Sequence, residues 1–213
     1  MEVHFLFSYQ NKERKEDYVL RKSLCFILIS LFSLLLVGCV QGKGIKNPLN
    51  LEVSEFSFTN QEGEKLGLDD LKGKVWIADF VFTNCTTVCL PMMANMTELQ
   101  GKLKEEDLNV ELISFSVDPA IDTPEVLKEY AGNYNADLSS WNFLTGYSQN
   151  TIKDFAAKSF KAIAIKPETG DQVIHGTSFY LVNKEGTVMK DYSGIDAPFD
   201  EIINDVKLLN SKE

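Results

Sequence analysis

Cys85-Thr86-Thr87-Val88-Cys89 is the stretch that decides how this chain folds and what chemistry it can do. It follows an apolar run, residues 75–82, that is typical of a buried strand. It precedes Pro91, which suits the first turn of a helix because its φ is preset and its missing N–H is not needed there. A thiol between a strand and a helix N-terminus readily becomes a thiolate. Side chains four residues apart on one helix face can reach a common atom, so the pair predicts a shared metal ion or a disulfide.

The N-terminal region has the features of a bacterial lipoprotein signal. Arg21 and Lys22 precede an apolar segment, residues 24–37, that is too short for a comfortable membrane span. The segment ends in Gly38-Cys39, which matches a lipobox, where cleavage falls before the cysteine and its sulfur receives a diacylglycerol. An uncleaved anchor with an incidental cysteine is the alternative.

These features predict three parts of the chain. Residues 1–38 form the signal peptide, residues 39–50 contain the lipidated Cys39 and a tether with Gly42, Gly44 and Pro48, and residues 51–213 form one domain. We therefore expect a lipid-anchored protein on the extracytoplasmic face of the cell membrane.

The charge of the expected mature chain excludes some partners. Residues 39–213 contain 16 lysines, no arginine and 27 acidic residues, a net charge of −11. An acidic chain without arginine is a poor ligand for phosphate or nucleic acid, so no nucleic-acid partner is expected. The acidity favours solubility, or attraction to a cation or a basic partner.

Cysteine usage narrows the chemistry further. Cys25 lies in the signal and Cys39 would carry lipid, so Cys85 and Cys89 are the thiols that remain in an exported protein. A disulfide across a four-residue step closes a very small loop and gains little loop entropy. A redox or metal role is therefore favoured over a structural staple.

The pattern of apolar residues predicts an α/β domain. A mixed central sheet flanked by helices, with an N-terminal β-hairpin extension, describes a thioredoxin-like fold. The expected elements are a hairpin at 56–68, strands at 75–82, 110–117, 141–144, 162–165, 178–182 and 187–192, and helices at 91–104, 123–134, 148–158 and from 198 onward.

His175 is the only imidazole in residues 39–213, and it lies just before the C-terminal hairpin. In a thioredoxin-like sheet the loop entering that hairpin lies beside the active-site turn, so we expect His175 to face Cys85 and Cys89. Two thiolates and one imidazole form a soft set of three ligands that suits Cu(I), or Cu(II) with a further oxygen ligand. Zinc would normally require a fourth ligand.

Other polar and sulfur side chains flank this set. Asp79 and Asp118 could hydrogen-bond His175 or the backbone of the cysteine loop, although Asp118 could equally cap the turn before Pro119. The methionines at 92, 93 and 96 offer thioether sulfur, but core packing is the favoured interpretation.

At these residues the chain resembles the Sco (SenC-like) family of cytochrome c oxidase assembly proteins, of the bacterial lipoprotein type. The resemblance covers about residues 50–210 and is carried by residues 82–89, by 115–119 with 122–124, and by 173–175 followed by 178–181. It implies a thioredoxin-like fold, a copper site made of Cys85, Cys89 and His175, and a role in metallating the binuclear Cu-A centre of oxidase subunit II.

The chain departs from the family pattern in the residues around the site. The family usually has proline directly after each cysteine and an arginine between the two aspartates of the second motif. Here Thr86, Leu90 and Ala120-Ile121 occupy those places, which leaves the redox tuning of the cysteine pair open.

Two functions remain from these observations. The first is a copper metallochaperone for subunit II, and the second is a thiol–disulfide oxidoreductase that keeps the cysteines of subunit II reduced. A copper donor or a thiol reductant would be a further partner. A peroxiredoxin-like peroxidase is a distant third, and a plain redox enzyme would not need His175.

Overall fold

The computed structural model describes residues 44–85, 88–170 and 172–211. The expected signal peptide and Cys39 lie outside the described residues. Within the described part of the chain, no helix is long and apolar enough to cross a membrane.

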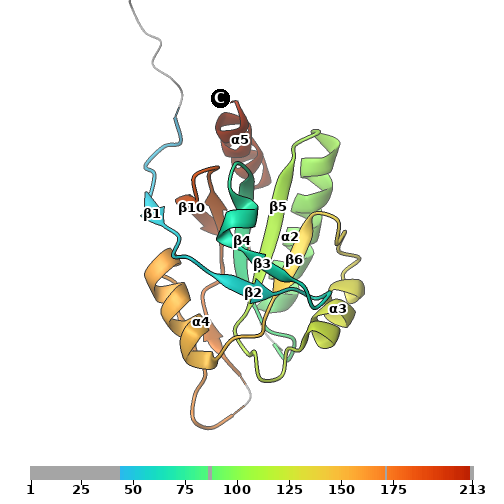
Figure 1. Cartoon of the computed structure of the whole chain (residues 1–213). Coiled ribbons are helices and arrows are strands. Elements are labelled where there is room, and N and C mark those ends of the chain that lie inside the picture. Colours follow the sequence, from blue (N-terminus) through green and yellow to red (C-terminus); the bar gives the residue numbers. More distant parts are fainter. Residues whose placement is uncertain (1–43, 86–87, 171, 212–213) are drawn as a thin grey trace, which may run out of the picture. The chain divides into compact units, whose positions relative to one another are not determined.

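A mixed six-stranded sheet forms the centre of the domain, in the order β1-β10-β9-β4-β5-β6 (Figure 1). Its strands β4, β5 and β6 are parallel, whereas β9, β10 and β1 add antiparallel pairs. The strands are β1 (Leu51–Glu52), β4 (Val75–Val81), β5 (Val110–Ser116), β6 (Trp141–Leu144), β9 (Ser178–Val182) and β10 (Thr187–Ser193). The thioredoxin-like arrangement expected from the sequence is confirmed.

Both faces of the sheet are covered, which explains why every residue of β4 except Asp79 is apolar. All seven residues of β4 are buried. Alternate side chains enter two separate hydrophobic clusters, with Trp76 and Phe80 in one and Ile77 and Val81 in the other.

The helices are α2 (Cys89–Glu105), α3 (Pro124–Asn133), α4 (Gln149–Phe155) and α5 (Phe199–Asn210), with a 3-10 turn η1 (Leu68–Leu71) and a π-helical turn η2 (Ala156–Phe160). Thr123 caps α3 as expected, because its side chain accepts a hydrogen bond from the Val126 N–H. The three methionines of α2 are fully buried, so core packing is their role.

The expected N-terminal hairpin is present as β2 (Ser57–Thr59) and β3 (Lys65–Gly67), which pair antiparallel. Phe56 and Phe58 pack beside Phe115 and Phe155 in the core. The domain's contacts also extend into the segment assigned to the tether, because the Leu49 N–H donates to the Met189 carbonyl at 2.9 Å.

Strand direction determines where the chemistry lies. Since β4 and β5 are parallel, the segments that follow them, residues 82–88 and 117–123, leave the sheet at the same edge. The first contains Cys85 and leads to Cys89 at the start of α2, and the second contains Asp118 and Asp122.

Candidate metal centre

The two cysteines occupy different positions at the start of α2. Cys89 is the first residue of the helix and only 1% exposed, whereas Cys85 is half-buried in the turn after β4. The expectation that both thiols lie on one helix face is wrong, because Cys85 precedes the helix. Its sulfur instead accepts a hydrogen bond from the Cys89 N–H at 3.3 Å. That N–H is among the first donors of the helix, which have no carbonyl partner within it.

This contact makes the Cys85 sulfur part of the helix N-terminus. Negative charge is stabilised there by the helix dipole and the free N–H groups, which favours a thiolate at Cys85. Burial, followed by the hydrogen bond and charge of Cys85, raises the pKa of Cys89 well above its ordinary value. The site therefore combines a half-buried sulfur at a helix N-terminus with a buried thiol that keeps its proton.

His175 reaches the thiols from a second, two-stranded sheet. This sheet consists of β7 (Ala164–Ile165) and β8 (Ile174–His175), with Ala164 opposite His175. The His175 Nε2 atom lies 3.2 Å from the Cys89 Sγ atom. The Phe82 and His175 rings pack edge to face, with their centroids 5.6 Å apart.

The hydrogen bonds of His175 determine its tautomer. Nδ1 lies 2.7 Å from the Gly176 carbonyl oxygen, and because a carbonyl only accepts, Nδ1 carries the hydrogen. Nε2 therefore presents its lone pair to the Cys89 thiol. Burial lowers the pKa of His175, which favours the neutral imidazole that binds metals.

The structure brings together the three residues that the sequence singled out as ligands. The ligand atoms of Cys85, Cys89 and His175 all lie within 4.8 Å of one another, and neither cysteine is in a disulfide. Two sulfur atoms and one imidazole nitrogen suit a soft ion in a three-coordinate site.

Asp79 and Asp118 make their hydrogen bonds away from the ligand atoms. Asp79 is fully buried in β4 and accepts a 2.6 Å hydrogen bond from Ser114. Burial raises the pKa of Asp79 to about 7, and no described group bonds its second oxygen. Asp118 pairs with Lys166 at 2.5 Å. Asp79 and Asp118 were both candidates to orient His175, but its Nδ1 atom instead bonds the Gly176 carbonyl.

Asp122 is the buried acid that the sequence interpretation missed as a site residue. It accepts a 2.6 Å hydrogen bond from the Thr83 hydroxyl and another of 2.6 Å from Ser116. Burial raises its pKa, opposed by these hydrogen bonds. The sequence signal that could have identified Asp122 is its position in the segment after β5. Because β5 runs parallel to β4, the ends of these two strands meet at one edge of the sheet.

Comparisons with known proteins agree with this geometry. The family model SCO1/SenC matches residues 46–210. The SCO1 protein homolog of Bacillus subtilis is 57% identical over 187 residues, which cover 87% of this chain and 95% of that protein.

Solved structures of similar chains share the fold. A SCO1/SenC family lipoprotein from Bacillus anthracis is 53% identical, with a TM-score of 0.77 over 79% of this chain and 100% of the other. BsSco, described as a member of the Sco family of cytochrome c oxidase assembly proteins with a disulfide switch, is 56% identical, with a TM-score of 0.75 over 80% of this chain and all of that one.

Arabidopsis thaliana ScoI, whose structure was solved with copper bound, is 27% identical, with a TM-score of 0.62 over 72% of this chain and 97% of that one. The match of the family model over most of the domain, together with 57% identity to a SCO1 homolog, shows that this chain belongs to the SCO1/SenC family.

Proposed function

We propose that this protein binds one copper ion through Cys85, Cys89 and His175 and delivers it to the Cu-A centre of cytochrome c oxidase subunit II. The observation that carries the proposal is the convergence of two thiols and one imidazole within 4.8 Å. Copper bound to Arabidopsis ScoI and the oxidase-assembly role given for the family of BsSco support the cargo and the client.

The difference between the two thiols indicates how copper would enter the site. Cys85 is the more exposed sulfur and lies at a helix N-terminus, so it makes the first bond to the ion. Bond formation at Cys89 then releases the proton that burial holds on this thiol. His175 offers Nε2 without losing a proton, because its hydrogen is on Nδ1.

A thiol–disulfide oxidoreductase that keeps the cysteines of subunit II reduced is the second candidate. Its supporting observation is the closeness of the two sulfurs, and the relative BsSco is described as having a disulfide switch. In that role Cys85 would attack a client disulfide, and Cys89 would then resolve the mixed disulfide and release the reduced client. This cycle does not require His175.

Copper titration of wild-type and His175→Ala domains, followed by absorption and electron paramagnetic resonance, separates the two functions. We expect His175→Ala to weaken Cu(II) binding much more than Cu(I) binding, since two thiolates still hold Cu(I). Disulfide formation between Cys85 and Cys89 should continue. Oxidised wild-type protein should bind copper far more weakly than reduced protein.

Ile174→Ala is the matched control, because Ile174 precedes His175 on β8 and is 57% exposed. It should bind copper as wild type does. If His175→Ala keeps wild-type affinity for both oxidation states and still supports oxidase assembly, the three-ligand site is wrong and the oxidoreductase function replaces it.

The proposed location is the outer face of the cell membrane, with the domain attached through a lipid on Cys39. The lipobox at Gly38-Cys39 supports this location, as does the description of the Bacillus anthracis relative as a lipoprotein.

A further inference from the structure

The ligands of the proposed copper site come from two different sheets. Cys85 and Cys89 follow β4 of the central sheet, whereas His175 belongs to the separate β7–β8 sheet. The distance between Cys89 and His175 therefore depends on contacts that hold these two parts together. Residues 116–122, which run from the last residue of β5 into the loop after it, contact both parts and are called the bracket below.

On the cysteine side, the bracket holds the turn that precedes Cys85. The carboxylate of Asp122 accepts hydrogen bonds from the Thr83 hydroxyl at 2.6 Å and from the Thr83 N–H at 3.3 Å. Thr83 is two residues before Cys85, and Asp122 is fully buried. This contact fixes the path of the chain into the cysteine turn.

On the histidine side, the bracket holds the end of β7. Lys166 follows β7 directly, and its ammonium group pairs with Asp118 at 2.5 Å. The Asp118 side chain is 2% exposed and that of Lys166 is 29% exposed, so solvent screens this pair less than a surface ion pair. A second contact between the two sides is the hydrogen bond that the Gln172 side chain donates to the Asn84 carbonyl, and it is exposed to solvent.

The bracket is itself rigid because its polar groups bond one another. Ser116 donates its hydroxyl hydrogen to Asp122 at 2.6 Å and accepts the Asp118 N–H at 3.1 Å. The Asp118 carbonyl accepts the N–H groups of Ile121 and Asp122, both at 3.0 Å. A continuous series of contacts thus runs from Thr83 through the bracket to Lys166.

We propose that Asp118, Asp122 and Lys166 are positioning residues that set the distance between the cysteine pair and His175. This inference rests on the proposed function, because it concerns the same copper site. Loss of the Lys166–Asp118 pair leaves both thiols and their turn in place but frees the strands that hold His175. Cu(II) binding, which depends on the imidazole, weakens more than Cu(I) binding.

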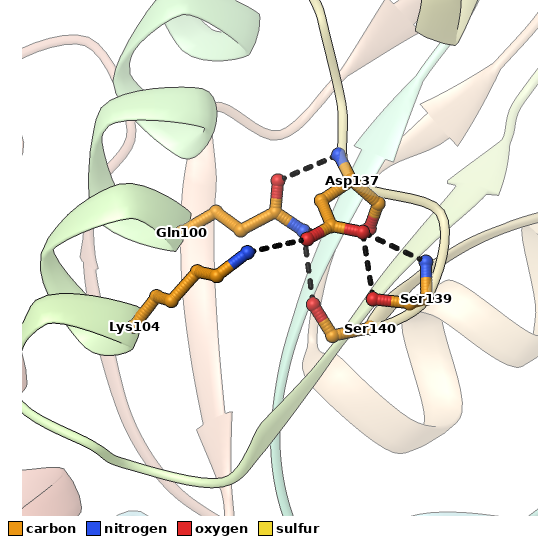
Figure 2. Close-up of polar contacts among 5 residues, drawn as sticks. All are labelled: Gln100, Lys104, Asp137, Ser139 and Ser140. Atoms are coloured by element: carbon orange, nitrogen blue, oxygen red, sulfur yellow. Dashed lines mark hydrogen bonds and ion pairs between the residues drawn. The ribbon is translucent and has the colours of Figure 1, made fainter.

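The test compares Lys166→Met with Lys104→Met. Figure 2 shows Lys104 beside Asp137, together with Gln100, Ser139 and Ser140. The Lys104 and Asp137 side chains pair at 3.1 Å, and Lys104 lies at the opposite end of α2 from Cys89. Both variants remove one positive charge from an ion pair. We expect Lys166→Met to bind Cu(II) about tenfold more weakly, the lower end of the effect of contacts that orient metal ligands. Lys104→Met should match wild type, and Lys166→Arg should restore most of the affinity.

Hydrogen exchange of the metal-free protein gives a readout that does not depend on copper. We expect the β8 amides to exchange faster in Lys166→Met and in Asp118→Asn than in wild type, and to stay unchanged in Lys104→Met. If wild type binds no copper but β8 exchange rises in these variants, the proposed function fails while the positioning role holds. Wild-type β8 exchange and wild-type Cu(II) affinity in folded Lys166→Met would overturn the inference, as would an equal loss in Lys104→Met.

Discussion

At the scale of single residues, Asp79 is the acid whose environment is least compatible with charge. It is fully buried, and one of its oxygens accepts a hydrogen bond from the Ser114 hydroxyl. The Ser114 oxygen in turn accepts a 2.9 Å hydrogen bond from the Trp141 ring N–H. Desolvation raises its pKa to about 7, partly offset by the Ser114 hydrogen bond. The folded domain therefore retains a proton here that the unfolded chain releases near its ordinary pKa.

This difference predicts how stability depends on pH. Between about pH 4 and pH 7 the folded state binds more protons at Asp79 than the unfolded state does, so this group lowers stability as the pH rises. Above pH 7 the carboxylate is charged in both states and the full destabilisation remains. Asp79→Asn should therefore gain stability relative to wild type on going from pH 5 to pH 8, by roughly 2.5 kcal/mol, because the difference grows by about 1.36 kcal/mol per pH unit between pH 5 and about pH 7.

Urea unfolding of the reduced domain at the two pH values measures this gain. Asp191→Asn, the same change at an exposed position of β10, is the control and should show no such pH-dependent gain. A stability difference between Asp79→Asn and wild type that is equal at pH 5 and pH 8 would contradict the buried-charge argument.

At the scale of elements, the N-terminus of α2 divides the chemistry between the two thiols. Cys85 lies outside the helix and accepts a helix N–H, whereas Cys89 is inside the first turn and buried. We expect iodoacetamide to alkylate Cys85 at least about tenfold faster than Cys89 in the reduced protein, because only a thiolate that the reagent can reach will react.

Mass spectrometry of the single variants Cys85→Ser and Cys89→Ser, each with one remaining thiol, would measure the two rates. Unfolding in urea should make the rates similar, since the burial and the helix contact are then lost. Equal rates in the folded protein would mean that the helix contact and the burial do not control thiol reactivity.

The elements that the sequence predicted are those with a repeating pattern. The buried run of β4 and the apolar stripe of α2 are long enough to show their period, and Thr123-Pro124 marks the start of α3 by its capping chemistry. The two-residue strands β1 and β8 have no such pattern. They are strands only because distant segments offer them partners.

The same limit explains what the sequence revealed of the candidate site. Residue type indicated Cys85 and Cys89, since few side chains bind soft metals, and the expected topology and the family resemblance added His175. Acidic residues are common, so nothing local distinguished Asp122 as the partner of Thr83, or Asp118 as the partner of Lys166. Those contacts join residues 39 and 48 positions apart, and only the fold brings them together.

At the scale of the whole molecule, the proposed lipid anchor determines where the copper site can work. The residues just before β1 already pack on the domain: Ile45 is buried, and the Leu49 N–H donates a hydrogen bond to the Met189 carbonyl of β10. An extended chain spans at most about 3.6 Å per residue, so the six-residue step from Cys39 to Ile45 reaches only about 20 Å. A lipid on Cys39 would therefore keep the domain close to the membrane, where an oxidase subunit is accessible.

Cys39→Ser tests this arrangement in the full chain. The variant should carry no diacylglycerol by mass spectrometry of the purified protein, and on processing it should leave the membrane fraction. Cys25→Ser is the matched control, because it removes a thiol from the apolar segment without touching the lipobox, and it should remain lipidated and membrane-bound. A wild-type protein that stays in the membrane without lipid would instead show that residues 24–37 act as an uncleaved anchor. The domain would then be held by a protein segment, and the distance argument from Cys39 would no longer apply.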